Sequence, residues 1–320
     1  MLRHLLMFTG IVATLGLSKI MPQHAITANT ANTANTYPVC NVLALSGGGS
    51  FGATQMGVLN GLYDTQRVPD SFDIITGVSA GGLNAGFLSY FNNVGDAFIP
   101  IQDIYANLST SDVYTLDMFG IFSEYSIYST EPLESTLANV IASYTRADNG
   151  PITLIGSTNL NHRTLDVFRY DTATDAEQLD ILMATSAIPL LFPPRHINDE
   201  LYADGGLISN ELIQQALSQK SCEFYNFTFI SASSKGADNI TIDGFFSYVG
   251  AVAKLLFNTF DNALAQYESV KCQDTPRGSI LACFPSNPAL DSYSVLDFDF
   301  GTILYALGKS QYNCSSYMFC

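Results

Sequence analysis

The chain has 320 residues, of which 47% are hydrophobic and only 13% are charged, so it carries enough apolar surface to fold and is not a disordered protein. Its formal net charge of −16 argues against electrostatic binding to nucleic acid or to strongly anionic membranes. At this length, one large α/β domain is as plausible as two smaller ones, and we expect one domain.

The first 36 residues have the pattern of a leader followed by a linker. A basic start precedes an apolar run over residues 5–17, which predicts a secretory signal peptide at residues 1–18. The run is shorter than the roughly 20 residues of a transmembrane helix, although an uncleaved signal anchor stays open. An Ala-Asn-Thr repeat then predicts a low-complexity linker over 19–36. We therefore expect a secreted or lumenal protein with one domain over 37–320.

Cysteines and glycosylation sequons agree with export. An even number of cysteines in an exported chain predicts disulfides, although the pairing cannot be read from the sequence. Sequons for N-glycosylation are also present. The cysteines are Cys40, Cys222, Cys272, Cys283, Cys314 and Cys320, and the sequons begin at Asn107, Asn226, Asn239 and Asn313.

Two strand–turn–helix units follow the linker. An apolar strand over 41–45 meets three glycines and leads into a helix over 53–63. The same order recurs with a strand over 72–76 and a helix over 80–90. Two such units in succession predict a parallel sheet covered by helices.

The rest of the chain contains fewer clear patterns. Local composition and periodicity predict a strand over 164–170, a helix over 176–187, a buried strand over 224–231 and a core-facing helix over 245–270. Beyond Cys272 we expect only short elements.

The pentapeptide from Gly77 to Gly81 has the G-x-S-x-G pattern of a nucleophile elbow around Ser79. This turn needs glycines because the serine backbone is strained and neighbouring chain segments pack closely against it. The pattern falls between a predicted strand and a predicted helix, as an elbow requires. Ser79 is therefore the predicted nucleophile.

A glycine-rich turn lies ahead of the elbow, over residues 47–52. Backbone N–H groups in such a turn at a helix N-terminus can stabilise an oxyanion. The turn also satisfies the G-x-G-x-x-G fingerprint of dinucleotide binding, but no acidic residue stands at the spacing that ribose binding requires. The hydrolase interpretation is therefore favoured over a nucleotide-binding oxidoreductase.

A serine nucleophile needs a base, and histidine is scarce in this chain. Beyond the N-terminal segment only His162 and His196 are present, and neither follows the Ser, Asp, His order of α/β-hydrolases. Asp204, followed by two glycines, offers a carboxylate that could act directly, although Asp-Gly is also a common structural turn. A carboxylate base requires a pKa raised above its ordinary value.

Together these motifs resemble the patatin-like phospholipase family in order and spacing. The resemblance spans roughly residues 42–210 and also includes an Ala-Ser-Ala-Ile-Pro-like segment. The motifs are residues 47–52, 77–85, 184–189 with Phe192, Pro193 and Pro194, and Asp204, Gly205 and Gly206. The chain departs from the family at Phe51, where a basic residue is common, and at Ser46, where aspartate is common.

The resemblance implies a three-layer α/β/α sheet domain with a nucleophile elbow, and a Ser79–Asp204 catalytic dyad. It implies hydrolysis of glycerolipid or phospholipid acyl esters at a membrane or micelle surface, without a metal or other cofactor. The implied oxyanion hole is Gly47, Gly48, Gly49 and Ser50, and the motif glycines are Gly52, Gly77, Gly81, Gly205 and Gly206.

Two other functions stay open. One is a Ser-His-Asp carboxylesterase that uses His196, and the other is a catalytically silent lipid-binding or storage protein. The sequence does not indicate the lipid head group, the position cleaved or the oligomeric state.

Overall fold

The computed structural model describes residues 38–117, 119–220, 222–232 and 277–319. The predicted leader, linker and 245–270 helix lie outside these residues, as do Cys272, Cys320 and the sequon at Asn239. Among the described residues, no helix combines the length and apolar character needed to cross a bilayer.

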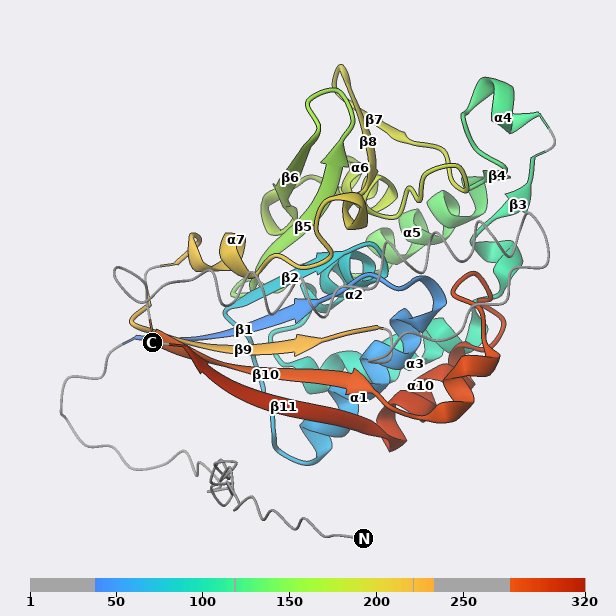
Figure 1. Ribbon diagram of the computed structural model, residues 1–320. Coiled ribbons are helices and arrows are strands. Elements are labelled where there is room, and N and C mark those ends of the chain that lie inside the picture. The colour runs from blue at the N-terminus through green and yellow to red at the C-terminus, as the bar shows by residue number, and fades with distance from the viewer. Residues whose placement is uncertain (1–37, 118, 221, 233–276, 320) are drawn as a thin grey trace, which may run out of the picture. The chain divides into compact units, whose positions relative to one another are not determined.

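A nine-stranded mixed sheet forms the centre of the domain (Figure 1). Its order is β11-β10-β9-β1-β2-β5-β8-β7, and β6 pairs with β5. The strands are β1 (Val39–Leu45), β2 (Ile74–Val78), β5 (Ile152–Asn159), β6 (Thr164–Arg169), β7 (Arg195–Ile197), β8 (Glu200–Asp204), β9 (Phe224–Ile230), β10 (Arg277–Pro285) and β11 (Tyr312–Phe319). A separate two-stranded ladder pairs β3 (Thr115–Leu116) with β4 (Tyr128–Ser129).

Both predicted strand–turn–helix units are confirmed. β1 leads through the glycine turn into α1 (Gly52–Asp64), and β2 leads into α2 (Ala80–Leu88). β1 and β2 are parallel, with Leu45 opposite Gly77. The glycine turn and the elbow therefore leave the sheet together at the carboxyl ends of two adjacent strands, where ligands of parallel sheets bind.

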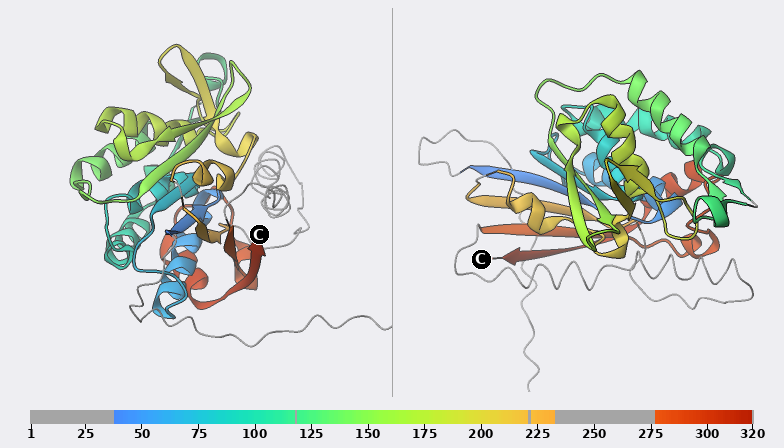
Figure 2. Two further views of the ribbon diagram at one scale, coloured as in Figure 1. Left: turned by 90° about the vertical axis from the view of Figure 1, so that its left-hand side faces the viewer. Right: turned by 90° about the horizontal axis from the view of Figure 1, so that it is seen from above.

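Helices cover both faces of the sheet, as the three-layer prediction requires (Figure 2). Side chains of β1 alternate between the faces, so that Leu43 packs with α1 while Val42 packs with Ile213 of α7. One face holds α1, α2, α3 (Phe98–Asn107), α5 (Glu131–Ser143), α6 (Asp175–Thr185) and α10 (Gly301–Ser310), and the other holds α7 (Ile213–Leu217). The remaining short helix, α4 (Gly120–Ser123), lies between β3 and β4.

The expectation of only short elements beyond Cys272 is wrong. β10 pairs parallel with β9 and antiparallel with β11, and α10 packs along α1. The helices approach so closely that a Cβ at Gly57 would lie 2.0 Å from the carbonyl oxygen of Tyr305. The edge strand β11 was not predicted because its polar sequence YNCSSYMF lacks a buried-strand pattern.

Within the described residues, two disulfides fasten neighbouring strands of this sheet. Cys40 near the start of β1 is bonded to Cys222 just before β9, and Cys283 of β10 is bonded to Cys314 of β11. The predicted pairing of cysteines is thus confirmed for these four.

Candidate active site

Ser79 occupies a strained turn between β2 and α2. Its backbone has φ 54° and ψ −130°, a region that residues other than glycine rarely adopt and that clusters at functional sites. A Cβ at Gly77 would lie 2.1 Å from the Gly81 oxygen, and a Cβ at Gly81 would lie 2.4 Å from the Leu45 oxygen. Close passage of the backbone therefore explains both glycines of the motif.

Thr185, at the end of α6, fixes the backbone of this turn. Its Oγ1 accepts the Ser79 N–H at 2.8 Å and donates to the Gly156 carbonyl of β5 at 2.6 Å. The fully buried hydroxyl thus ties the Ser79 backbone to the neighbouring strand. We did not predict Thr185 as a site residue, because it lies 106 residues from Ser79 in the sequence.

Asp204 ends β8 and is held in place by its backbone. Its N–H donates to the Ala187 carbonyl at 2.9 Å, and its carbonyl accepts from Thr158 Oγ1 at 2.9 Å. In the side chain, Oδ1 accepts the Gly206 N–H at 2.8 Å, whereas the buried Oδ2 has no hydrogen-bond partner among the described residues.

The Ser79 hydroxyl lies close enough to Asp204 to lower the carboxyl pKa, but it does not make a hydrogen bond of ordinary geometry with it. Catalytic hydrogen bonds are often long before substrate binds. Burial is the larger influence, and it raises the pKa of Asp204 from 3.8 to about 7 against the opposing Ser79 and Gly206 interactions. The direction is the one predicted for a carboxylate base.

The glycine turn does not offer all four of the predicted oxyanion donors. The Gly47 N–H donates to Asn210 Oδ1 at 2.8 Å, and the Ser50 N–H donates to the Val295 carbonyl at 2.8 Å. The amides of Gly48 and Gly49 donate to no other described residue. The prediction is therefore narrowed to these two, because internal hydrogen bonds already occupy the amides of Gly47 and Ser50.

A buried chain of amide side chains supports the turn. Gln55 Nε2 donates to the Ser46 carbonyl at 3.0 Å, Asn84 Nδ2 donates to Gln55 Oε1 at 2.9 Å, and the Tyr105 hydroxyl donates to Asn84 Oδ1 at 2.7 Å. Asn84 lies within the motif over residues 77–85, but no motif signals Gln55 or Tyr105. The available sequence signal for these two was a polar group within a largely apolar helix.

The two departures from the family pattern have structural explanations. Phe51 is buried in the main core, so its side chain is not offered to a ligand. Ser46 Oγ accepts the Ala232 N–H at 3.1 Å, and this bond ties the start of the glycine turn to the end of β9.

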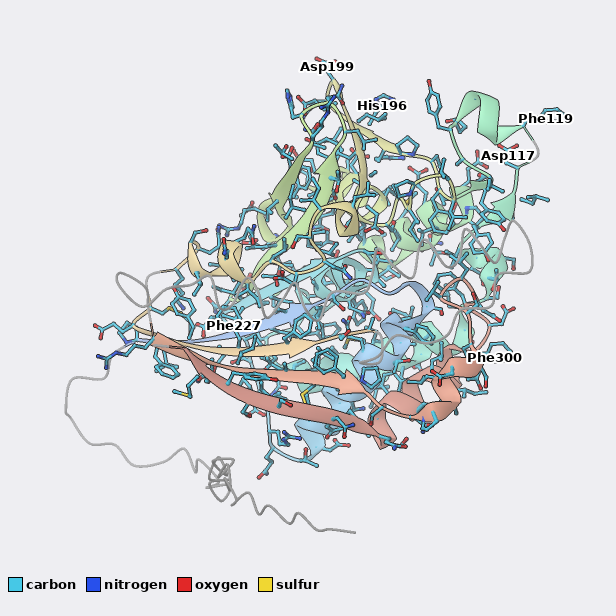
Figure 3. All side chains as sticks on the ribbon, viewed as in Figure 1. Asp117, Phe119, His196, Asp199, Phe227 and Phe300 are labelled. Atoms are coloured by element: carbon cyan, nitrogen blue, oxygen red, sulfur yellow. A yellow bond between two sulfur atoms is a disulfide. The ribbon has the colours of Figure 1, made fainter. Side chains whose placement is uncertain are left out.

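Neither described histidine lies at the dyad. His162 Nε2 is bonded to Glu200 Oε1 at 2.6 Å on the surface, and His196 is exposed on β7 beside the hairpin that carries Asp199 (Figure 3). Across the described ranges, no group of three or more His, Cys, Asp or Glu side chains could hold a metal ion.

A small apolar cavity begins one helical turn after Ser79. It occupies about 80 Å³ between α2, α3 and α5, and its walls include Leu83, Phe87, Ile104 and Leu137. The N–H of Leu83 donates to the Ser79 carbonyl at 3.0 Å, so this wall of the cavity is joined directly to the elbow.

The family model for patatin-like phospholipase matches residues 43–217, more than half of the chain. The chain belongs to the patatin-like phospholipase family. The matched range contains the glycine turn, Ser79, Asp204 and Asn210.

Similar proteins come from a virus and from bacteria. "Probable lipid hydrolase 463L" of Invertebrate iridescent virus 6 is 29% identical over 185 residues, 55% of this chain and 62% of the relative. A "cGAMP-activated phospholipase" of Vibrio cholerae serotype O1 is 27% identical over 196 residues, 53% of this chain and 54% of the relative. The chain thus spans only about half to three fifths of the length of these relatives.

Among solved structures, VipD from Legionella pneumophila is similar with a TM-score of 0.39 and 12% identity. This similarity covers 87% of the present chain and 68% of VipD.

Proposed function

We propose that this chain is a lipid acyl hydrolase of the phospholipase A or lysophospholipase type, with Ser79 as nucleophile and Asp204 as base. The observation that carries the proposal is the buried Asp204 carboxylate beside a serine on a strained elbow. Its pKa is raised to about 7, and its Oδ2 has no partner within the part of the chain that the structure describes. Perturbed carboxylates next to a nucleophile are typical of active sites.

In the proposed first step, Asp204 Oδ2 accepts the Ser79 proton as Oγ attacks the ester carbonyl. The amides of Gly48 and Gly49 donate to the oxyanion that forms. The tetrahedral intermediate collapses to an acyl-enzyme, and the alcohol leaves with the proton held on Asp204.

In the second step, Asp204 accepts a proton from water as the water attacks the acyl-enzyme. Collapse of the second intermediate returns this proton to Ser79 Oγ and releases the fatty acid. Throughout both steps, Thr185 holds the Ser79 backbone and the Gly206 amide holds Asp204 Oδ1. These bonds position the dyad without taking part in the proton transfer.

The apolar cavity beside Leu83 supports an acyl substrate. Its walls are almost entirely hydrocarbon, and α2, the helix that follows Ser79, forms one of them. Burial of an acyl chain there stabilises the bound ester by about 0.8 kcal/mol per methylene. The substrate we propose is therefore a glycerolipid or phospholipid presented at a membrane or micelle surface.

We also propose that the protein acts after export, with a signal peptide over 1–18, a linker over 19–36 and the catalytic domain over 37–320. The two disulfides support this location, because disulfides persist in oxidising compartments. Glycosylation remains part of the proposal for Asn107, which is exposed at the end of α3.

The test is hydrolysis of a panel of labelled lipids by the purified protein and by its Ser79→Ala variant, with and without calcium. We expect the wild-type protein to release fatty acid, and Ser79→Ala to lose both this activity and labelling by a fluorophosphonate probe. A wild-type protein that binds lipids without cleaving any would instead support the silent lipid-binding alternative.

The choice of base is tested by two further variants. We expect Asp204→Asn to be inactive and His196→Ala to retain most activity, because His196 lies on exposed β7. The reverse pattern would replace the dyad with a Ser-His-Asp triad.

A further inference from the structure

Four large apolar side chains are exposed on the segment from β3 to β4, which contains α4, and on the neighbouring loop after α6. We call Leu116, Phe119, Tyr125 and Leu190 the apolar patch, and their exposed fractions are 59%, 77%, 68% and 64%. Figure 3 shows Phe119 projecting away from the body of the domain. Exposed apolar groups that gather in one region mark interaction surfaces.

The two halves of the patch are joined by backbone pairing. The Ile127 N–H donates to the Leu190 carbonyl at 3.0 Å, and Ser126 forms a bridge with Leu190. The loop after α6 and the segment that immediately precedes β4 are therefore held against each other. The patch combines these two chain segments into one surface.

Two members of the patch have strained backbones. Tyr125 has φ 60° and Leu190 has φ 69°, a region that large side chains rarely adopt because it is energetically unfavourable. Both side chains are exposed, so burial of these side chains does not offset the cost. Strain that holds apolar groups in solvent is typical of a binding surface.

The patch is connected to the dyad through a short segment. Leu190 follows Ala187, whose carbonyl accepts the Asp204 N–H, and Thr185, whose hydroxyl accepts the Ser79 N–H. Residues 185–190 thus touch both members of the dyad and then reach the surface. A surface bound at Leu190 would lie against the same segment that positions the reacting groups.

The charge around the patch determines which kind of partner surface can bind it. A hollow of about 490 Å³ beside the patch is lined by five carboxylates against Arg195, which is ion-paired to Glu134 and Asp180. Asp117 and Glu124, which belong to this lining, flank Phe119 and Tyr125 in the sequence. This excess of negative charge repels anionic lipids and favours a surface whose outermost groups are ammonium ions.

We propose that the apolar patch is the surface by which this protein docks on zwitterionic lipid, of the phosphatidylcholine type. The side chains of the patch enter the interfacial layer while the neighbouring carboxylates face the head-group ammonium ions. The inference rests on the proposed lipid hydrolase function, because docking would bring the dyad to its substrate.

The test is partition onto phosphatidylcholine vesicles, measured by flotation in the Ser79→Ala background so that the lipid is not consumed. We expect Phe119→Ser with Leu190→Asn to weaken partition at least about tenfold, because two large apolar side chains are lost from the interface. Asn tolerates the left-handed backbone at position 190. Leu116→Ser is a second, independent variant that leaves both strained positions intact.

Ile99→Ser is the matched control, because Ile99 is 75% exposed but lies on α3 outside the patch. We expect it to partition like its parent, and we expect replacement of a third of the phosphatidylcholine by phosphatidylglycerol to weaken binding. Thermal unfolding checks that each variant is folded.

The proposal is overturned if folded patch variants partition like their parent, or if anionic vesicles bind better than zwitterionic ones. Patch-dependent binding to a basic protein without vesicle binding would also overturn it. Hydrolysis of a dissolved short-chain ester by the wild-type protein tests the proposed function separately. Patch-dependent vesicle binding without ester hydrolysis would contradict only the proposed function.

Discussion

Asp204 illustrates how one residue links catalysis to stability. Its carboxyl group is buried, and burial raises its pKa to about 7, so near neutral pH both the protonated and the ionised forms are populated. In the proposed mechanism the ionised form is the base, yet it is the form that burial disfavours. Activity and stability should therefore respond to pH in opposite directions.

The first prediction concerns the pH dependence of activity. Because Asp204 must be ionised to accept the Ser79 proton, kcat/KM for a dissolved ester should rise about tenfold per pH unit below pH 7 and level off above it. Initial rates across this range at constant ionic strength measure the profile. A flat profile between about pH 5 and pH 8 would show that this ionisation does not control the reaction.

The second prediction concerns stability in the Asp204→Asn variant. The folded pKa of about 7 lies above the unfolded value of 3.8, so the wild-type protein has its full stability below the unfolded pKa and loses part of it as pH rises through 7. Asn does not titrate. Relative to wild type, the variant should therefore gain up to about 3 kcal/mol between about pH 5 and pH 8.

Urea unfolding of both proteins at pH values of about 5 and 8 measures this difference in stability. Activity assays measure the loss of hydrolysis in the variant. An Asp204→Asn protein that loses stability relative to wild type as pH rises would contradict the raised pKa.

At the scale of secondary-structure elements, the sequence predicted local motifs. It did not predict contacts between residues that lie far apart in the sequence. The elbow and the glycine turn could be recognised because each is a short pattern between a strand and a helix. Asn210 Oδ1 accepts the Gly47 N–H although the two residues are 163 positions apart in the sequence. Gln55 Nε2 donates to the Ile230 carbonyl over a sequence separation of 175 residues. No local periodicity encodes such contacts.

β5 was missed for a related reason. Its first half is apolar, but Ser157, Thr158 and Asn159 are polar residues of the kind that is typical of a loop. The structure buries all three, and Thr158 Oγ1 bonds the Asp204 carbonyl. A strand buried on both faces lacks the alternation that reveals half-exposed strands.

The third prediction isolates the positioning role of Thr185. Thr185→Val keeps the shape of the side chain but removes the hydroxyl that joins the Ser79 amide to the Gly156 carbonyl. Two buried polar groups lose a partner, so we expect a loss of about 1–3 kcal/mol in stability and about 10- to 100-fold in kcat. Urea unfolding and steady-state kinetics measure the two effects.

Thr76→Val is the matched control for this variant. Thr76 is equally buried in β2, three residues before the nucleophile, but its hydroxyl has no hydrogen-bond partner among the described residues. We expect no loss of stability and little change in kcat. Equal effects of the two substitutions would mean that removal of a hydroxyl, rather than loss of the Ser79 bond, explains the result.

At the scale of the whole domain, the two disulfides between described cysteines lie at opposite ends of the parallel strands. Cys40 is near the start of β1, away from the glycine turn that follows Leu45. Cys283 lies opposite Ile230, which is itself opposite Leu45 at the carboxyl ends of the strands. One disulfide therefore fastens the end of the sheet remote from the dyad, and the other fastens the end beside it.

The last prediction separates these roles. In the chain-entropy model a disulfide stabilises more when it closes a longer loop, about 5 kcal/mol for the 182-residue separation of Cys40 and Cys222 and about 4 kcal/mol for the 31-residue separation of Cys283 and Cys314. Replacing Cys40 and Cys222 by Ala should therefore cost more unfolding free energy.

Activity should follow the opposite order in the same two variants, measured well below their unfolding temperatures. Replacing Cys283 and Cys314 by Ala frees the strand end whose Cys283 carbonyl accepts the Ser231 N–H at 3.0 Å, next to the Ile230 carbonyl that Gln55 holds. Because Gln55 also holds the Ser46 carbonyl, looser strand ends should disturb the oxyanion turn and lower kcat. Urea unfolding and kcat for both double variants provide the comparison, and a larger loss of kcat without the Cys40–Cys222 bond would refute the assignment of the second disulfide to the active-site end.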